Sequence, residues 1–208
     1  MVQQSKSDRS WILIMMKWTY NFNMKKIVFL VLLSLTATAS ASEENLSFPF
    51  TSDSGKYWQY VSDRTMGGIS NGQVTLEQDA GISFAKLTGN VSTKNNGGFI
   101  QLRSRISFAN SDKTGKELQG VRLNVRGNGE TYHIFIRTND TRSYSDYYSA
   151  TFQANTNWEV IEFPFSSFER KRAPDSTLRA RNIRAFAVVA YGRDFTADVS
   201  VSTVDFYY

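Results

Sequence analysis

The chain contains the segment Asp63-Arg64-Thr65-Met66-Gly67-Gly68-Ile69-Ser70 and, about thirty residues later, the segment Asn95-Asn96-Gly97-Gly98-Phe99. Adjacent glycines reach backbone angles that other residues avoid, so each segment predicts a tight turn. Polar side chains beside such a turn bond either the turn itself or a ligand. Asp63, Arg64, Asn95 and Asn96 are therefore candidate binding residues, with turn bonding by Asp63 as the alternative.

The sequence around these segments alternates in the manner of β-strands. Val121, Leu123 and Val125, for example, are each separated by one polar residue. A period of two indicates strands with one buried and one solvated face. Strands are expected at residues 73–77, 82–91, 98–107, 121–126, 132–138, 148–153, 158–163, 183–191 and 199–207. Many short strands without intervening helices predict an all-β fold, an antiparallel jelly-roll β-sandwich.

Residues 24–41 have the layout of a secretory signal peptide. A basic start at Lys25 and Lys26 precedes an apolar run over residues 27–35, and the stretch ends Ala39-Ser40-Ala41. The apolar run is shorter than the roughly 20 residues of a membrane-spanning helix. We therefore expect cleavage after Ala41, no stable membrane span afterwards, and a periplasmic or secreted protein. An uncleaved anchor is the alternative.

The segments on either side of this leader differ in kind. Residues 1–23 precede a methionine that already starts a complete signal peptide, so they are predicted to be an extension outside the fold. Residues 42–208 form a stretch of 167 residues without cysteine, which suits one domain held together by packing alone. The sequence therefore predicts one jelly-roll domain over 42–208.

The net charge does not favour a nucleic-acid partner. The full chain carries 24 Lys and Arg against 19 Asp and Glu. Residues 1–41 hold five of the basic residues and one of the acidic ones, which leaves 19 against 18 in the predicted domain. Nucleic-acid binding requires a surplus of cations to displace counterions from phosphate.

From about Phe48 to Tyr208 the sequence resembles the complex I intermediate-associated protein 30 family. The landmarks that carry the resemblance occur in order: Trp58, Ser62 to Ser70, Asn96 to Phe99, Arg126 to Gly129, Tyr132, Tyr148, Phe152, Trp158 and Pro164 to Phe168. The resemblance implies a galactose-binding-like jelly roll. It also implies a chaperone-like assembly factor without a reaction of its own, because the mitochondrial members help to build respiratory complex I.

A third group of candidate binding residues lies after the second glycine-containing segment. Arg126, Asn128 and Tyr132 would form a polar rim if the jelly roll brings its loops together. Exposed tyrosines such as Tyr144 and Tyr147 suit glycans and protein interfaces alike, because each offers an apolar ring and a hydroxyl.

Catalysis receives no support from the residue types present. With no cysteine and His133 as the single histidine, the chain lacks a thiol nucleophile and the ligands of a histidine or cysteine zinc site. Asp63, Glu130, Glu159, Glu162 and Asp205 are carboxylates for a hydrolytic pair, but no spacing selects two of them. We expect no catalytic residue, metal or cofactor.

Two binding functions lead, and a hydrolase is a third alternative. The leading hypothesis is a non-enzymatic exported module that holds a protein partner, with a membrane-complex subunit as one possibility. The alternative is a lectin-like domain that binds envelope or extracellular glycan. Exposed aromatic residues on a concave sheet with Arg122, Asn124 and Arg126 would favour glycan, whereas a broad apolar patch would favour protein.

We expect the protein from its native host to begin at Ser42, because signal peptidase cleaves after an Ala-x-Ala site. Mass spectrometry of the intact protein measures this, and the variant Ala41→Arg should retain the leader. Recovery of wild-type chains that begin at Met24 in the membrane fraction would instead support the uncleaved anchor.

Overall fold

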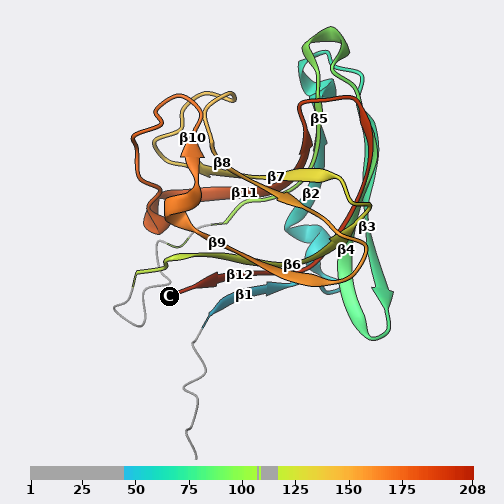
Figure 1. Ribbon diagram of the computed structural model, residues 1–208, viewed down its shortest axis with the longest axis horizontal. Helices are drawn as coiled ribbons and strands as arrows, with labels where there is room; N and C mark the ends of the chain where they lie inside the picture. The colour runs from blue at the N-terminus through green and yellow to red at the C-terminus, as the bar shows by residue number, and fades with distance from the viewer. Residues whose placement is uncertain (1–44, 107, 109–116) are drawn as a thin grey trace, which may run out of the picture. The chain divides into compact units, whose positions relative to one another are not determined.

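The structure is a computed structural model that describes residues 45–106, 108 and 117–208. The predicted leader and upstream extension lie outside these residues. Within the described residues, twelve strands form two antiparallel sheets of six strands each (Figure 1), which confirms the expected all-β jelly roll. In the described part of the chain, no helix has the length and apolar character needed to cross a membrane.

The two sheets take strands from all parts of the sequence. In the first sheet the order is β3 (Asn71–Asp79), β4 (Ile82–Val91), β12 (Phe195–Tyr207), β6 (Gly120–Gly127) and β9 (Glu159–Pro164), and β1 (Leu46–Pro49) also pairs with β12. In the second sheet the order is β10 (Glu169–Arg170), β8 (Tyr148–Gln153), β7 (Thr131–Thr138), β11 (Ile183–Tyr191), β5 (Phe99–Ser104) and β2 (Trp58–Ser62). Short 3-10 turns connect several of them: η1 (Ser54–Lys56), η2 (Asp63–Met66), η3 (Lys94–Asn96), η4 (Phe165–Ser167) and η5 (Ala180–Asn182).

Most expected strands are present, but β1, β2 and β10 escaped the sequence analysis. In β2, Tyr60 and Ser62 lie on the same side as Trp58, so polar atoms occupy its inward positions and obscure the alternation. The strand β12 also starts four residues before its expected position. Its register with β6 shifts between Val201 and Thr203, and on its other edge it pairs first with β4 and then with β1.

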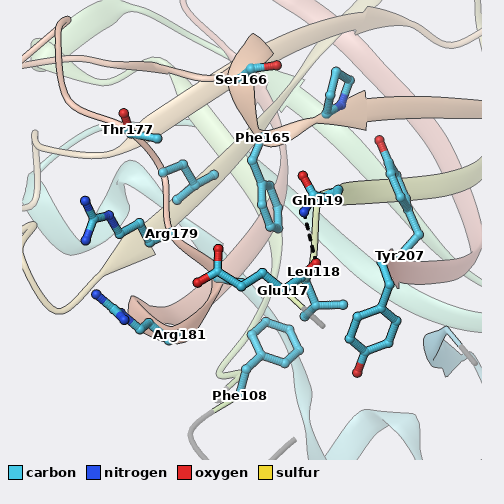
Figure 2. A pocket seen from close by; sticks show the side chains of 14 residues that line it. Phe108, Glu117, Leu118, Gln119, Phe165, Ser166, Thr177, Arg179, Arg181 and Tyr207 are labelled. Carbon is cyan, nitrogen blue, oxygen red and sulfur yellow. Dashed lines mark hydrogen bonds between the residues drawn. The ribbon is translucent and has the colours of Figure 1, made fainter. Parts of the chain in front are cut away.

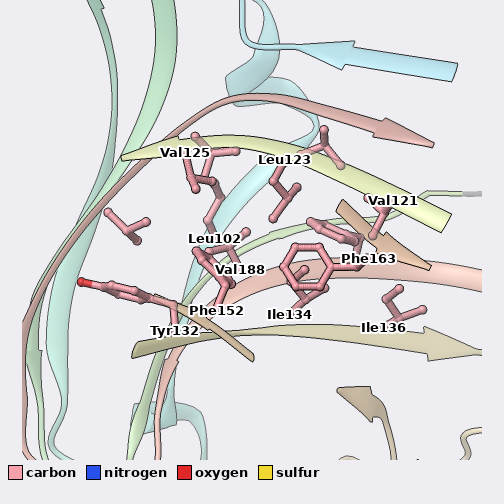
Figure 3. Packing of buried hydrophobic residues seen from close by; sticks show 14 of the residues in the cluster. Leu102, Val121, Leu123, Val125, Tyr132, Ile134, Ile136, Phe152, Phe163 and Val188 are labelled. Carbon is pink, nitrogen blue, oxygen red and sulfur yellow. The ribbon is translucent and has the colours of Figure 1, made fainter. Parts of the chain in front are cut away.

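The core lies between the sheets and is built from the inward residues of the alternation. Val121, Leu123 and Val125 on β6 face Ile134 and other buried side chains of the second sheet (Figure 3). Trp58, Phe165 and Phe168 join this core. Trp158 is half-buried and lies against Phe84 on the outer face of the first sheet.

Phe206 is the position at which we expect the largest cost of truncation. Its ring is fully buried and meets Phe48, Phe108 and Phe186 at centroid distances of 6.0, 4.7 and 5.9 Å. We expect Phe206→Ala to lower the free energy of unfolding by about 3 to 5 kcal/mol, because it leaves a cavity. Urea unfolding measures the change. Val160→Ala, at an exposed site, should change it by less than about 0.5 kcal/mol, and similar values for both variants would contradict this view of the core.

Candidate functional site

The carboxylate of Asp63 joins the two glycine-containing segments. Its Oδ1 accepts the Ser70 backbone N–H at 3.0 Å, and its Oδ2 accepts the Ser70 hydroxyl at 2.5 Å. Oδ2 also accepts the backbone N–H groups of Gly98 and Phe99 at 2.6 and 3.1 Å. Asp63 is fully buried, so its side chain bonds the turns, the alternative that the sequence left open.

The two segments are the crossovers between the sheets. Residues 63–70 lead from β2 in the second sheet to β3 in the first, and residues 92–98 lead from β4 back to β5. The Ser70 hydroxyl reinforces the link, because its oxygen accepts the Ser92 N–H at 2.9 Å and lies 3.2 Å from the Ser92 carbonyl oxygen. We call residues 63–70 and 92–98 the motif loops.

The glycines of the motif loops are required by the space that Asp63 occupies. A Cβ at Gly68 would lie 2.3 Å from the Asp63 Cγ, and a Cβ at Gly97 would lie 2.5 Å from Oδ2. Any side chain at these positions would displace the carboxylate. Gly68, Gly97 and Asp63 therefore act together to hold the two motif loops, and we call this arrangement the clamp.

The clamp presents other residues of the motif loops to solvent. Met66 is 56% exposed and Ile69 is 47% exposed, and Arg64, Asn95 and Asn96 are exposed as well. Both asparagines adopt left-handed backbone angles, with φ of 56° and 57°. Of the four candidates from these segments, three are thus available to a partner, and Asp63 holds the turns that carry them.

The third candidate group does not form a common rim. Tyr132 is fully buried, where its hydroxyl donates to Asn128 Oδ1 at 2.7 Å and accepts the Asp198 N–H at 2.8 Å. Asn128 also donates to the Thr196 carbonyl at 2.8 Å. Arg126 lies on the outer face of the first sheet instead. Tyr132 and Asn128 fasten β7 to β12, so the structure gives both a structural role.

On the outer face of the first sheet, the polar side chains bond to other residues of the protein. Arg126 pairs with Asp79 at 3.0 Å and lies over the Trp158 ring, with 4.8 Å to the centroid. Arg122 pairs with Glu162 at 2.6 Å. Asn124 donates to the Ser202 hydroxyl at 2.7 Å. The polar row that would have favoured glycan here is therefore occupied by contacts within the protein.

The outer face of the second sheet carries an aromatic cluster that the sequence analysis did not assemble. Phe135 stacks on Tyr147 with ring centroids 3.9 Å apart, and it meets Tyr191 edge-on at 5.2 Å. His133 lies 5.4 Å from Tyr191. Figure 1 shows the loop after β7 extending from this sheet on the side away from β6, β9 and β12. Tyr147, expected to be exposed, is only 7% exposed and lies beneath this surface, whereas His133, Phe135 and Tyr191 are half-buried. We call the outer surface around these four rings the aromatic face.

Arginines adjoin the aromatic face. Arg137 on β7 lies opposite Ala185, and Arg103 on β5 lies opposite Ala187. Burial lowers the pKa of both guanidiniums, and neighbouring guanidiniums, Arg184 among them, lower it further. Several guanidinium groups therefore lie close enough on this face to repel one another. The register of three strands creates the group, and no local motif signals it.

A pocket of about 740 Å³ lies where the end of β12 meets the chain after β9 and before β11. Figure 2 shows Glu117, Arg179 and Arg181 on one side of it, and Phe165 and Tyr207 toward the other.

His133 belongs to the aromatic face. Burial lowers the pKa of its imidazole, and the charge of Arg193 lowers it further. Its ring contacts are Phe135 and Tyr191. Among the described residues, no group of three or more histidines and carboxylates is placed to hold a metal ion.

Comparison with known proteins agrees with the fold. A family model described as complex I intermediate-associated protein 30 matches residues 48–196, and no curated protein matches the chain.

The chain is similar in structure to a family 11 carbohydrate-binding module of cellulosomal cellulase Lic26A-Cel5E of Clostridium thermocellum (14% identity, TM-score 0.58, 73% of this chain and 87% of that one). It is also similar to a Clostridium thermocellum family 11 module in complex with a β-1,3-1,4-mixed-linked tetrasaccharide (14%, 0.58, 77% and 95%). A third is the family 30 module of Clostridium thermocellum cellulase Cel9D-Cel44B (10%, 0.50, 72% and 90%). At such identities the likeness shows the fold alone, and it confirms the galactose-binding-like jelly roll.

We expect Asp63→Asn to lower the free energy of unfolding by about 3 kcal/mol at pH 7, because an amide NH₂ would replace an oxygen that accepts hydrogen bonds. Chemical denaturation measures the loss. Asp53→Asn, which removes a carboxylate paired with Lys56 on the surface, should cost less than about 1 kcal/mol.

The stability that Asp63 contributes should depend on pH. Burial alone would raise the pKa of Asp63, but the hydrogen bonds from Ser70, Gly98 and Phe99 outweigh it and hold the pKa below its ordinary value. A lowered folded pKa stabilises the protein above the unfolded pKa of about 3.9, and this stability is lost as pH falls through the folded pKa. The stability of Asp63→Asn should therefore decline less than that of the wild type below pH 4. Equal declines would refute the clamp.

Proposed function

The chain belongs to the complex I intermediate-associated protein 30 family, and from that premise we propose that it is a non-catalytic, exported binding module that holds a protein partner. The matching residues 48–196 include both motif loops. Its predicted leader would bring the domain to the periplasm or the exterior. The partner would then be a protein of that compartment, such as an exposed subunit of a membrane complex.

The observation that carries this proposal is the pairing of a rigid clamp with exposed apolar side chains. Asp63 is buried and fully hydrogen-bonded, yet the turns that it holds expose Met66 and Ile69. A surface that is ordered before binding loses little conformational entropy when a partner docks. Met is well suited to a protein interface, because its flexible thioether adapts to the opposing surface.

The polar residues of the motif loops define the chemistry of the partner. Arg64 is exposed and forms no ion pair with any described residue. Asn95 and Asn96 add exposed amides. A fitting partner presents an apolar pocket for Met66 and Ile69 with an acidic group at its edge for Arg64, since arginine binds carboxylates through two parallel hydrogen bonds.

Capture experiments test the proposal. We expect the tagged protein, expressed with its own leader in its native host and crosslinked, to co-purify with a defined set of proteins. The variants Met66→Gln and Ile69→Gln should reduce this recovery about tenfold, because each removes a buried apolar contact from the interface. Mass spectrometry quantifies the recovered proteins.

Val160→Gln is the matched control, because it makes the same kind of change at another exposed apolar site, 60% exposed on β9. It should leave recovery unchanged. The proposal fails if the wild type enriches no protein over an unrelated exported control, or if Val160→Gln and Met66→Gln lower recovery equally.

A further inference from the structure

The two outer faces of the sandwich differ in how their charges are balanced. On the first sheet, Lys86, Arg122 and Arg126 each pair with a carboxylate, at 3.3, 2.6 and 3.0 Å. On the second sheet, neither Arg103 nor Arg137 lies in an ion pair with a described residue. The second sheet therefore has an uncompensated positive charge on its outer face.

The arginines around this face differ in what holds them. The Arg137 guanidinium donates to the backbone carbonyls of Ser143 and Tyr144, and Arg184 donates to the Thr141 carbonyl at 2.7 Å. These three bonds hold the loop after β7. The half-buried Arg103 side chain, by contrast, makes no hydrogen bond to a described residue. Arg103 thus keeps its donors free, beside guanidiniums that are already fixed in place.

The register between the strands positions these charges beside the rings. Ala187 on β11 lies between Arg103 on β5 and Phe135 on β7. Because alanine is short, the guanidinium and the ring flank a central strand with little side chain of its own. Residues two apart on a strand repeat every ~6.6 Å, so His133, Phe135 and Arg137 form a row of roughly 13 Å.

This combination suits an acidic sugar chain. Aromatic rings offer apolar surface to sugar rings, and guanidiniums bind carboxylate or sulfate groups through paired hydrogen bonds. Tyr144, which is 83% exposed with the Arg137 guanidinium 5.8 Å from its ring centroid, extends the surface beyond the sheet. An acidic peptide would satisfy the arginines but would not need the row of rings.

We propose that the aromatic face, together with Arg103 and Arg137, binds an acidic polysaccharide whose carboxylate or sulfate groups contact the arginines. This site adjoins the motif loops, because Tyr191 pairs with Phe99 and Gly192 donates to the Gly98 carbonyl at 2.9 Å, but it uses other side chains and requires no protein partner. It also differs from the polar row of Arg122, Asn124 and Arg126, whose charges and amide are already bonded within the protein.

Titration calorimetry of the purified protein tests the site with two acidic polymers, polygalacturonate and dextran sulfate, and their neutral counterparts, methyl-esterified polygalacturonate and dextran. We expect at least one acidic polymer to bind. Its neutral counterpart should bind with an affinity at least about tenfold lower, because the charge-assisted contact is lost. Whichever polymer binds identifies the anionic group as carboxylate or sulfate.

Variants then locate the binding. Arg103→Gln should weaken it about tenfold, and Tyr144→Ala, at a site too exposed to affect folding, should weaken it severalfold. Arg122→Gln removes the same charge from the first sheet and should leave binding unchanged.

The proposal is overturned if neither acidic polymer binds, or if Arg103→Gln and Arg122→Gln have the same effect. It is also overturned if poly-glutamate binds as tightly and is equally sensitive to Arg103→Gln, because the site would then recognise acidic protein. Each of these failures leaves the protein-partner proposal intact, since that proposal depends on Met66 and Ile69.

Discussion

The buried carboxylate of Asp63 is the constraint on which the motif loops depend. It accepts hydrogen bonds from two crossovers, one leaving the second sheet and one returning to it, and so fixes how the sheets are joined at that end. A buried charge is tolerated only where donors surround it, and here they do. The glycines at 68 and 97 are part of the same solution, because a Cβ at either position would collide with this carboxylate.

The sequence predicted the architecture well because its signals are local. Alternation in β6 and β8 and the glycine turns identified most strands. The prediction missed β2, where Tyr60 and Ser62 occupy inward positions, and it could not place the candidate site residues. Whether Asp63 faces solvent or its own turn depends on the position of Gly98, 35 residues away. Tyr132 similarly bonds across to Asp198, which no local pattern reveals.

Local sequence patterns also could not reveal the aromatic face. Arg103 and Arg137 are far apart in the sequence and become neighbours only because β5 and β7 both pair with β11. In each strand the outward aromatic residues resemble ordinary packing residues. The contrast between the sheets is likewise visible only in three dimensions, since ion pairs such as Arg126 with Asp79 neutralise one outer face and leave the other positive.

The route of β12 has a bearing on how the molecule folds. This strand pairs with β4, β6 and β1, and its pairing with β1 places Leu46 opposite Phe206, 160 positions later. The first sheet thus closes only when distant parts of the chain meet, and such non-local pairing slows folding. A chain that folds slowly exposes its apolar strands to other chains for longer before its sheets assemble.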